Sequence, residues 1–431
     1  MKKIIISLLI AGAAIAANAQ DKALLETLVK KGMLTQQEAA QIAKESVAVT
    51  PCTKTTKSIK LFGGGRGYYE WSQASVRNPS DAPSQAQKSG FELKHIKLGV
   101  KADVGAGWSA TVITDFGTEG ADLNYIDKAV ASKKIDLDYI NGTLEFGLRK
   151  VNMGYEQTTC DFGLLTIDRS VATYFFTRGN ADDDVIRNFG SRTTGVFWDG
   201  NITQVDGLYY GVSVVSSTSQ VDNAVNDLIS GVSDSNSLSF FVNAGYKNVA
   251  DVKGETISYD AGINFGYAPR GAKQAFDDQE GSIWGINPYA TLNWRGLTTI
   301  AEFFFQQVED YANNNGITRS PLGANLTVAY KMDIGEWGAI EPVARFSFVA
   351  SNGLGVSPLS QRYDNNWAND NYTFDNAMTV FAGVNWYITP AIKTSLGYEY
   401  GYYYDSVNNS DLNKGYRAYD NTIRAQVQVL F

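Results

Sequence analysis

The chain has 431 residues and a formal net charge of -8, an acidic balance that argues against a nucleic-acid binder, which presents a basic face to phosphate. Its single histidine, His95, and its two cysteines, Cys52 and Cys160, are too few for zinc clusters or a disulfide scaffold. Aromatic residues make up 12% of the chain, which favours β structure.

The first residues have the pattern of a secretory signal peptide. Lys2 and Lys3 precede an apolar run over 4–17, and Ala17-Asn18-Ala19 matches the cleavage pattern of signal peptidase. The run is shorter than the roughly 20 residues that a transmembrane helix needs, although an uncleaved anchor remains the alternative. We therefore expect residues 1–19 to be removed and the protein to be exported.

The next segment, 20–50, predicts a periplasmic helical hairpin or arm. Leu24, Leu25 and Leu28 recur at helical spacing, and Thr35 with Glu38 forms a capping-box pattern. Helices this short need a packing partner, so the arm either extends into solvent or serves oligomerisation or docking. Residues 51–57 have the composition of a linker.

From residue 58 onward the hydrophobic pattern has a period of two. In the last segment Ile423, Val427 and Phe431 are apolar, and polar residues alternate with them. Such alternation is typical of strands with one apolar and one polar face. The strands are about ten residues long, are separated by polar segments and carry aromatic residues at their ends. We expect an all-β transmembrane antiparallel barrel over 58–431, with a soluble β-sandwich as the alternative.

Several segments resemble the phosphate-selective porin O and P family of Gram-negative outer membranes. They include KHIKLG at 94–99, LTIDRS at 165–170, GAIEPVAR at 338–345 and GVNWY at 383–387. The helical lead at 24–45 and residues 108–116, 147–178 and 424–431 also match. The resemblance implies a 16-stranded, commonly trimeric barrel with a constriction loop, around 155–192, folded into the pore.

Basic residues that face the pore water are the candidate site, because arginine and lysine bind phosphate and other anions. The candidate pore-lining and anion-binding residues are Lys60, Arg66, Lys97, Lys101, Arg149, Arg169, Arg178, Arg187 and Arg192. An alternative is that these bases pair with carboxylates and brace the loop; the candidate partners are Asp136, Asp138, Glu145 and Asp168. Inward-facing acids are about as numerous, and they include Asp115, Glu302, Glu341 and Glu399. The sequence therefore shows no continuous basic ladder.

Other motifs give weaker signals. The glycines at 63–67 are better explained by strand geometry than by a phosphate loop, because no helix follows them. The acidic run at 182–184 lacks the spacing of a calcium loop. A disulfide between Cys52 and Cys160 stays open. His95 is expected to line the pore, since no hydrolase motif accompanies it.

These observations predict an outer-membrane porin for the passive diffusion of small hydrophilic solutes, with an anion or phosphate preference as the finer expectation. The protein is expected to be no enzyme, to hold no cofactor or metal and to bind no nucleic acid. Expected partners are outer-membrane lipid, lipopolysaccharide and two further copies in a homotrimer. The alternative is a structural or adhesive barrel whose loops close the lumen.

Overall fold

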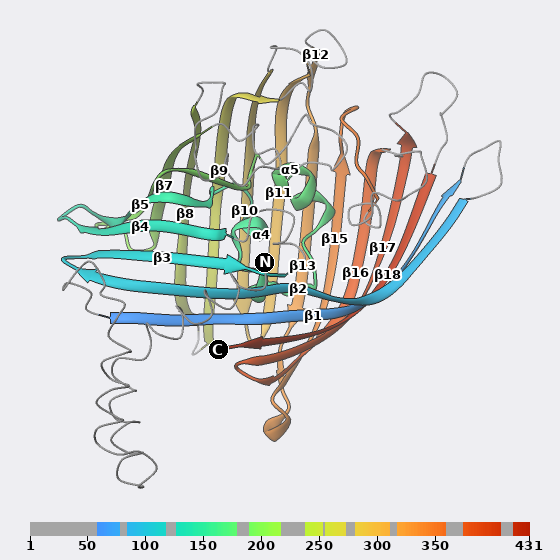
Figure 1. Ribbon diagram of the computed structural model, residues 1–431, viewed down its shortest axis with the longest axis horizontal. Helices are drawn as coiled ribbons and strands as arrows, with labels where there is room; N and C mark the ends of the chain where they lie inside the picture. Colours follow the sequence, from blue (N-terminus) through green and yellow to red (C-terminus); the bar gives the residue numbers. More distant parts are fainter. Residues whose placement is uncertain are drawn as a thin grey trace, which may run out of the picture.

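The computed structural model describes residues 58–77, 84–117, 126–178, 189–216, 238–252, 255–272, 281–310, 317–358, 374–406 and 417–431. One antiparallel sheet closes on itself, because β1 pairs with β2 along one edge and with β18 along the other (Figure 1). Closure gives every strand two neighbours and so removes the free edges of the sheet.

The strands follow one another around the barrel in chain order. They are β1 (Ser58–Arg77), β2 (Ser84–Gly105), β3 (Trp108–Asp115), β4 (Ile126–Asp136), β5 (Ile140–Lys150), β6 (Arg192–Ile202), β7 (Leu208–Ser216), β8 (Leu238–Val252), β9 (Glu255–Ala272), β10 (Gly281–Trp294), β11 (Leu297–Asp310), β12 (Ile317–Arg319), β13 (Leu322–Tyr330), β14 (Met332–Asp333), β15 (Ala339–Ala350), β16 (Phe374–Thr389), β17 (Ile392–Ser406) and β18 (Arg417–Leu430). The helices are α4 (Tyr155–Thr158), η2 (Asp161–Gly163), α5 (Val171–Arg178) and η5 (Gly335–Trp337). None of the helices in these described ranges has both the length and the apolarity to cross a membrane.

The barrel wall has sixteen strands. Of the eighteen segments, β12, β13 and β14 are pieces of one wall strand, since β11 pairs with both β12 and β13, and β15 pairs with both β13 and β14. The predicted 16-stranded antiparallel barrel is confirmed. The predictions for residues 1–19, 20–50 and 51–57, namely the signal peptide, the helical arm and the linker, lie outside the described residues.

Connections at the two ends of the barrel differ in length. At one end the turns are tight, as between β10 and β11, where only Arg295 and Gly296 intervene and both have positive φ (48° and 83°). Two consecutive positive φ values match the twist of a two-residue hairpin turn. The other end carries the longer connections, including 151–191 between β5 and β6. We call these the short-turn end and the long-loop end.

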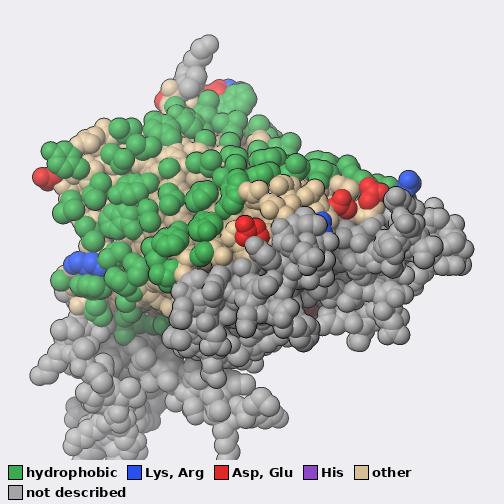
Figure 2. Space-filling view, turned by 90° about the horizontal axis from the view of Figure 1, so that it is seen from above, with side chains coloured by type: hydrophobic (Ala, Val, Ile, Leu, Met, Phe, Trp, Pro, Cys, Tyr) green, Lys and Arg blue, Asp and Glu red, His purple; other side chains and the backbone are tan. Residues whose placement is uncertain are grey.

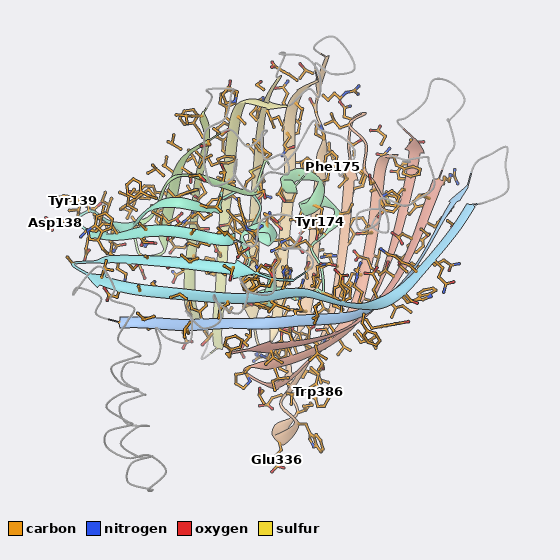
Figure 3. All side chains as sticks on the ribbon, viewed as in Figure 1. Asp138, Tyr139, Tyr174, Phe175, Glu336 and Trp386 are labelled. Carbon is orange, nitrogen blue, oxygen red and sulfur yellow. The ribbon has the colours of Figure 1, made fainter. Side chains whose placement is uncertain are left out.

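The outer face of the wall is apolar. Exposed side chains in mid-strand include Phe346, Val384 and Val427, each 40–54% exposed. Figure 2 shows hydrophobic side chains spread over much of the visible wall, with few charges among them. Aromatic residues lie near both ends of the wall. Tyr139 and Trp386, which Figure 3 shows at the margin of the barrel, are near the short-turn end. Tyr402 and Tyr419, whose ring centroids are 5.3 Å apart, are near the long-loop end. An apolar band bordered by aromatic residues is the surface that a lipid bilayer requires.

The inner face changes character along each strand. In β11 the inward Glu302 lies toward the short-turn end, whereas the inward Phe304 and Val308 lie toward the long-loop end, and all three are at most 3% exposed. In β18 the inward series begins with the apolar Ala418 at the long-loop end and continues with polar residues down to Gln428. The lumen therefore has a polar short-turn half and an apolar long-loop half.

Candidate functional site

Residues 151–178, which contain α4, η2 and α5, fold into the lumen and contact its wall from several directions (Figure 1). We call them the inward segment. Gly154 has a φ of 89°, which turns the chain away from the wall before α4. The first backbone amides of α4, those of Tyr155 and Glu156, then donate to the Glu302 carboxylate at 2.6 and 3.1 Å. A carboxylate at this position satisfies amides that a helix leaves unpaired at its start.

Asp161 in η2 is the centre of one buried ion cluster. Its carboxylate pairs with Lys97 of β2 and, at 2.5 Å, with Arg169, while Arg66 Nη1 of β1 donates to its backbone carbonyl at 3.2 Å. Burial would raise the pKa of Asp161, but the charges of Arg169, Lys150 and Lys97 outweigh burial and hold that pKa well below its usual range. The cluster joins the segment to β1 and β2.

Arg345 of β15 is the centre of a second cluster. Its guanidinium donates to Glu156 Oε1 at 3.0 Å, to Thr166 Oγ1 at 2.9 Å and to the carbonyl of Asp168 at 2.6 Å, all within the inward segment. It also donates to Glu399 Oε1 of β17 at 2.9 Å. The side chain is about 1% exposed, and two carboxylates balance its buried charge.

Polar side chains of the wall also bind the backbone of the inward segment. Asn385 donates to the carbonyl of Leu165 at 2.8 Å, Lys393 to that of Leu164 at 2.9 Å, and Gln428 to that of Phe162 at 3.0 Å. On another side of the lumen, Gln306 donates to the carbonyl of Phe176 at 2.8 Å. The segment is thus attached to strands on several sides of the barrel rather than to one arc.

In the long-loop half, α5 packs against the wall in an apolar core. Phe176 stacks on Phe304 with ring centroids 5.1 Å apart, and Figure 3 shows the neighbouring Phe175 in the middle of the barrel. Wall residues from β6 round to β18 complete the core; they include Phe197, Val215, Phe241, Ala268, Ile283, Val308, Val349, Ala377, Tyr403 and Ala418. Each of these is at most 1% exposed, so this part of the lumen is filled by side chains.

The predicted basic residues divide into three groups. Arg66, Lys97 and Arg169 are buried in the Asp161 cluster. Arg149 pairs with Glu145 and Asp199 at 2.7 and 2.5 Å, and Arg192 pairs with Asp127. Lys60 and Lys101 are exposed and lie opposite each other in register on β1 and β2. The Arg178 side chain and Arg187 lie outside the described residues.

These pairings agree better with the alternative in which the bases pair with carboxylates and brace the loop than with a continuous row of anion-binding bases. Of the four acids proposed as braces, Glu145 pairs with Arg149, and Asp168 pairs with Lys94 and lies 4.0 Å from Arg66. The four inward acids are buried, each at most 5% exposed; they are Asp115, Glu302, Glu341 and Glu399. Paired charges contribute little net field to the surrounding water.

His95 has a partner that the sequence did not reveal. Its Nδ1 lies 2.6 Å from Asp115 Oδ2 of β3, and its ring meets Phe162 of the inward segment edge-on at 6.4 Å. The residue is 2% exposed, so it lies between wall and segment rather than in open water. Cys160 is exposed, and Cys52 lies outside the described residues.

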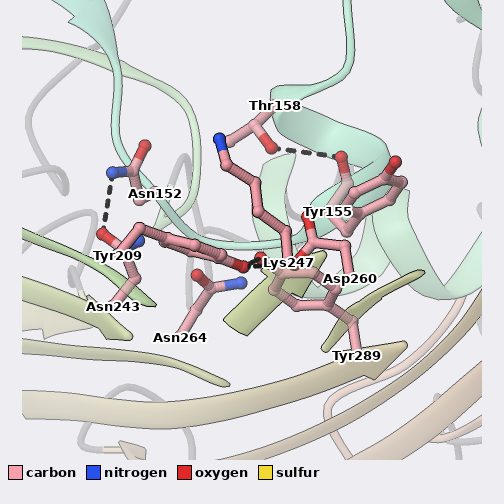
Figure 4. Close-up of a pocket in the computed structure, with 9 residues that line it drawn as sticks. All are labelled: Asn152, Tyr155, Thr158, Tyr209, Asn243, Lys247, Asp260, Asn264 and Tyr289. Carbon is pink, nitrogen blue, oxygen red and sulfur yellow. Dashed lines mark hydrogen bonds between the residues drawn. The ribbon is translucent and has the colours of Figure 1, made fainter. Parts of the chain in front are cut away.

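A solute-sized cavity lies in the short-turn half, between the inward segment and β7–β10 (Figure 4). It encloses about 220 Å³ and is lined by Asn152, Tyr155, Thr158, Tyr209, Asn243, Lys247, Asp260, Asn264 and Tyr289. None of these residues was among the candidates from the sequence, and neither was Arg345. Tyrosine and asparagine carry no charge, and only the pairing of strands in the barrel brings them together.

Solved structures similar to this barrel include bacterial outer-membrane porins. An anion-selective porin from Comamonas acidovorans is 11% identical with a TM-score of 0.52, covering 87% of this chain and 99% of the porin. OprB of Pseudomonas putida is 11% identical with a TM-score of 0.53, covering 85% of this chain and 94% of OprB. OmpF of Salmonella typhi, in complex with daunomycin, is 14% identical with a TM-score of 0.51, covering 89% of this chain and all of OmpF. The chain therefore has the porin fold.

No protein-family model matches the sequence, and no curated protein matches it. The resemblance to the phosphate-selective O and P family accordingly stays a prediction. At identities this low, the structural likeness describes the barrel and does not identify a solute.

Proposed function

We propose that this protein is an outer-membrane channel through which small hydrophilic solutes diffuse passively, without covalent chemistry. The supporting observation is the sorting of side chains across one closed wall: apolar residues such as Phe346 and Val427 face outward, while charged residues such as Glu341 and Arg345 face inward. A closed wall with this apolar outer face is suited to a lipid surrounding.

Export, location and assembly belong to the same proposal. Cleavage after residue 19 would deliver the chain to the periplasm, from where the barrel would insert into the outer membrane among lipid and lipopolysaccharide. A homotrimer is the assembly that the family resemblance implies. The inward segment, which overlaps the loop expected around 155–192, would act as the constriction.

The proposed anion or phosphate preference rests on few residues. Lys60 and Lys101 are exposed on the inward-facing pattern of β1 and β2, whereas Arg66 and Lys97 are held in ion pairs. We therefore expect a weak anion preference that comes from these two lysines and from residues outside the described ranges.

The test is single-channel recording with the mature protein in a planar bilayer. We expect stepwise conductance in KCl, and the reversal potential in a salt gradient gives the ion preference. Lys60→Ala combined with Lys101→Ala should move the reversal potential toward cation preference. A matched control is Lys133→Ala, which removes a lysine from the outward-facing positions at the short-turn end of β4, where its Nζ lies 5.6 Å from the Trp108 ring centroid. A protein that inserts but never conducts would contradict the channel proposal.

The apolar core in the long-loop half favours a second candidate, a structural or adhesive barrel with a closed lumen. Side chains such as Phe176, Phe241 and Phe304 are at most 1% exposed and leave little room beside α5. If the protein is such a closed barrel, it should insert into the membrane in the same way but let no solute through. Liposome swelling in glycerol or glucose separates the two, because only a channel lets the solute enter.

A further inference from the structure

We infer that the cavity between the inward segment and β7–β10 binds one neutral, polyhydroxylated solute, of the size and chemistry of a monosaccharide. This inference rests on the proposed channel function and names a solute class for it. The cavity volume of about 220 Å³ is below the roughly 300–1,000 Å³ of drug-sized ligand sites, which suits a single sugar ring.

Two tyrosines, Tyr209 and Tyr289, form an aromatic platform in this cavity. Tyr209 of β7 lies across Gly245 of β8, where an added Cβ would collide with its hydroxyl. At Gly262 of β9 an added Cβ would meet Tyr289 Oη at 2.8 Å. Because both glycines lack side chains, the two rings lie against the wall and are only partly buried. Tyrosine rings combine an apolar face, which packs against C–H groups, with a polar hydroxyl.

The platform is held in place by hydrogen bonds and by the inward segment. Tyr209 donates to Asp260 Oδ1 at 2.6 Å, and its hydroxyl also bonds that of Tyr289. Tyr155 of α4 packs on Tyr289 with ring centroids 5.0 Å apart. The aromatic surface therefore extends from the wall to the inward segment, and its rings are oriented before any solute arrives, which lowers the entropy cost of binding.

Amide groups around the platform supply both donors and acceptors. Asn152 donates to Asn243 Oδ1 at 2.9 Å, and Asn264 donates to Asn287 Oδ1 at 2.8 Å. Among the described residues, these bonds use the Asn243 oxygen and the Asn264 nitrogen, so Asn243 Nδ2 and Asn264 Oδ1 remain for a solute. A sugar hydroxyl both donates and accepts, and it matches such a mixed lining.

The charges in the cavity argue against an anion or a cation as the solute. Asp260 would repel phosphate, and the exposed Lys247, whose Nζ lies 5.6 Å from the Tyr209 ring centroid, would repel a cation. Together the two charges nearly cancel. A neutral solute loses little by desolvation here and gains ring contacts and hydrogen bonds.

The test is saturation-transfer difference NMR with D-glucose and the detergent-solubilised protein, a method that detects weak binding without any need for conduction. We expect a glucose signal for the wild type and a weaker signal for 1,4-dioxane, a neutral ring without hydroxyl groups. Tyr289→Ala should weaken apparent glucose affinity by about three- to tenfold, which is the usual range for one aromatic contact.

The matched control is Tyr387→Ala. Tyr387 is also an inward, partly buried tyrosine, and it donates to Glu341 at 2.7 Å, but it lies on β16, outside the cavity. Its loss should leave the glucose signal unchanged. Tyr209→Phe keeps the ring and removes the hydroxyl with its bonds to Asp260 and Tyr289, so it provides a second test if Tyr289→Ala does not fold; we expect about a twofold weakening.

Several results would overturn the inference: no glucose signal for the wild type, equal loss in the Tyr289 and Tyr387 variants, or displacement of glucose by equimolar inorganic phosphate. Planar-bilayer conductance tests the channel itself. Conductance without glucose binding would remove the sugar site and leave the channel, whereas glucose binding without conductance would remove the channel and leave the site.

Discussion

The two halves of the lumen are built from the same strands, yet their inward side chains differ in polarity. In the short-turn half the inward positions are polar or charged, as with Glu302 and Asn325, and they bind the inward segment through hydrogen bonds and ion pairs. In the long-loop half many inward positions are apolar, as with Phe304 and Val308, and pack on α5, and the polar Gln306 between them bonds the backbone of α5. The period of two along a strand fixes which side chains point inward, but their character depends on what they meet there.

The comparison teaches which half of the lumen has room for a solute. Polar walls that are not wholly covered by the inward segment, as around Tyr209 and Asp260, leave space for water and solute. The apolar half has little such space and behaves like the core of a soluble protein. We therefore expect substitutions in the polar half to change both stability and conductance, and substitutions in the apolar half to change stability alone.

The largest effect is expected for Arg345→Ala. The change leaves the buried carboxylates of Glu156 and Glu399 without their shared cation, which should lower the free energy of unfolding by about 3–5 kcal/mol. It also releases the middle of the inward segment, so single-channel conductance and current noise should rise. Urea unfolding in lipid vesicles and bilayer recording measure the two effects.

Arg417→Ala is the control for this change, because Arg417 is exposed at the long-loop end of β18. It should shift the free energy of unfolding by no more than about 0.5 kcal/mol. Wild-type conductance together with wild-type stability in Arg345→Ala would show that the segment is held by other contacts.

A smaller effect is expected for Asp161→Asn, about 1.5–3 kcal/mol at neutral pH, because charge-assisted bonds to Lys97 and Arg169 are weakened. The pKa of Asp161 is lower in the folded protein than its ordinary value of 3.8. Its contribution to stability is therefore complete above that ordinary value and is lost as the pH falls through the lower folded value.

The difference between wild type and Asp161→Asn should accordingly stay constant from about pH 7 to pH 5 and shrink only under stronger acid. Urea titrations at several pH values measure it. A difference that already disappears near pH 5 would contradict the buried ion cluster.

The smallest effect is expected for Phe176→Leu, which keeps an apolar side chain in the long-loop half but loses the stack on Phe304. We expect a loss of less than about 1.5 kcal/mol, with conductance unchanged. Phe91→Leu, at a position that is 89% exposed on β2, is the control and should change stability by no more than about 0.5 kcal/mol. Altered ion selectivity in Phe176→Leu would contradict the claim that substitutions in the apolar half change stability alone.

Much of the wall could be predicted from the sequence. Ile423, Val427 and Phe431 alternate with polar residues and all face outward, 40–72% exposed, as their spacing predicts. The inward direction of Arg66, Lys97 and Glu399 is also as predicted. The partners of these residues could not be predicted: Lys97 meets Asp161 across 64 residues, and Arg345 meets Thr166 across 179.

The sequence by itself determined the strands, the outward face and the closed barrel, because contact with lipid requires an apolar side chain at every second position and this requirement is local. Only the tertiary structure decided which charges face water. The inward segment reaches strands that are distant in sequence and binds Arg66 and Lys97 among the predicted bases, while the tyrosines and amides of β7–β10 line the cavity beside it. Such pairing depends on distances across the lumen, and the order of residues along the chain does not contain them.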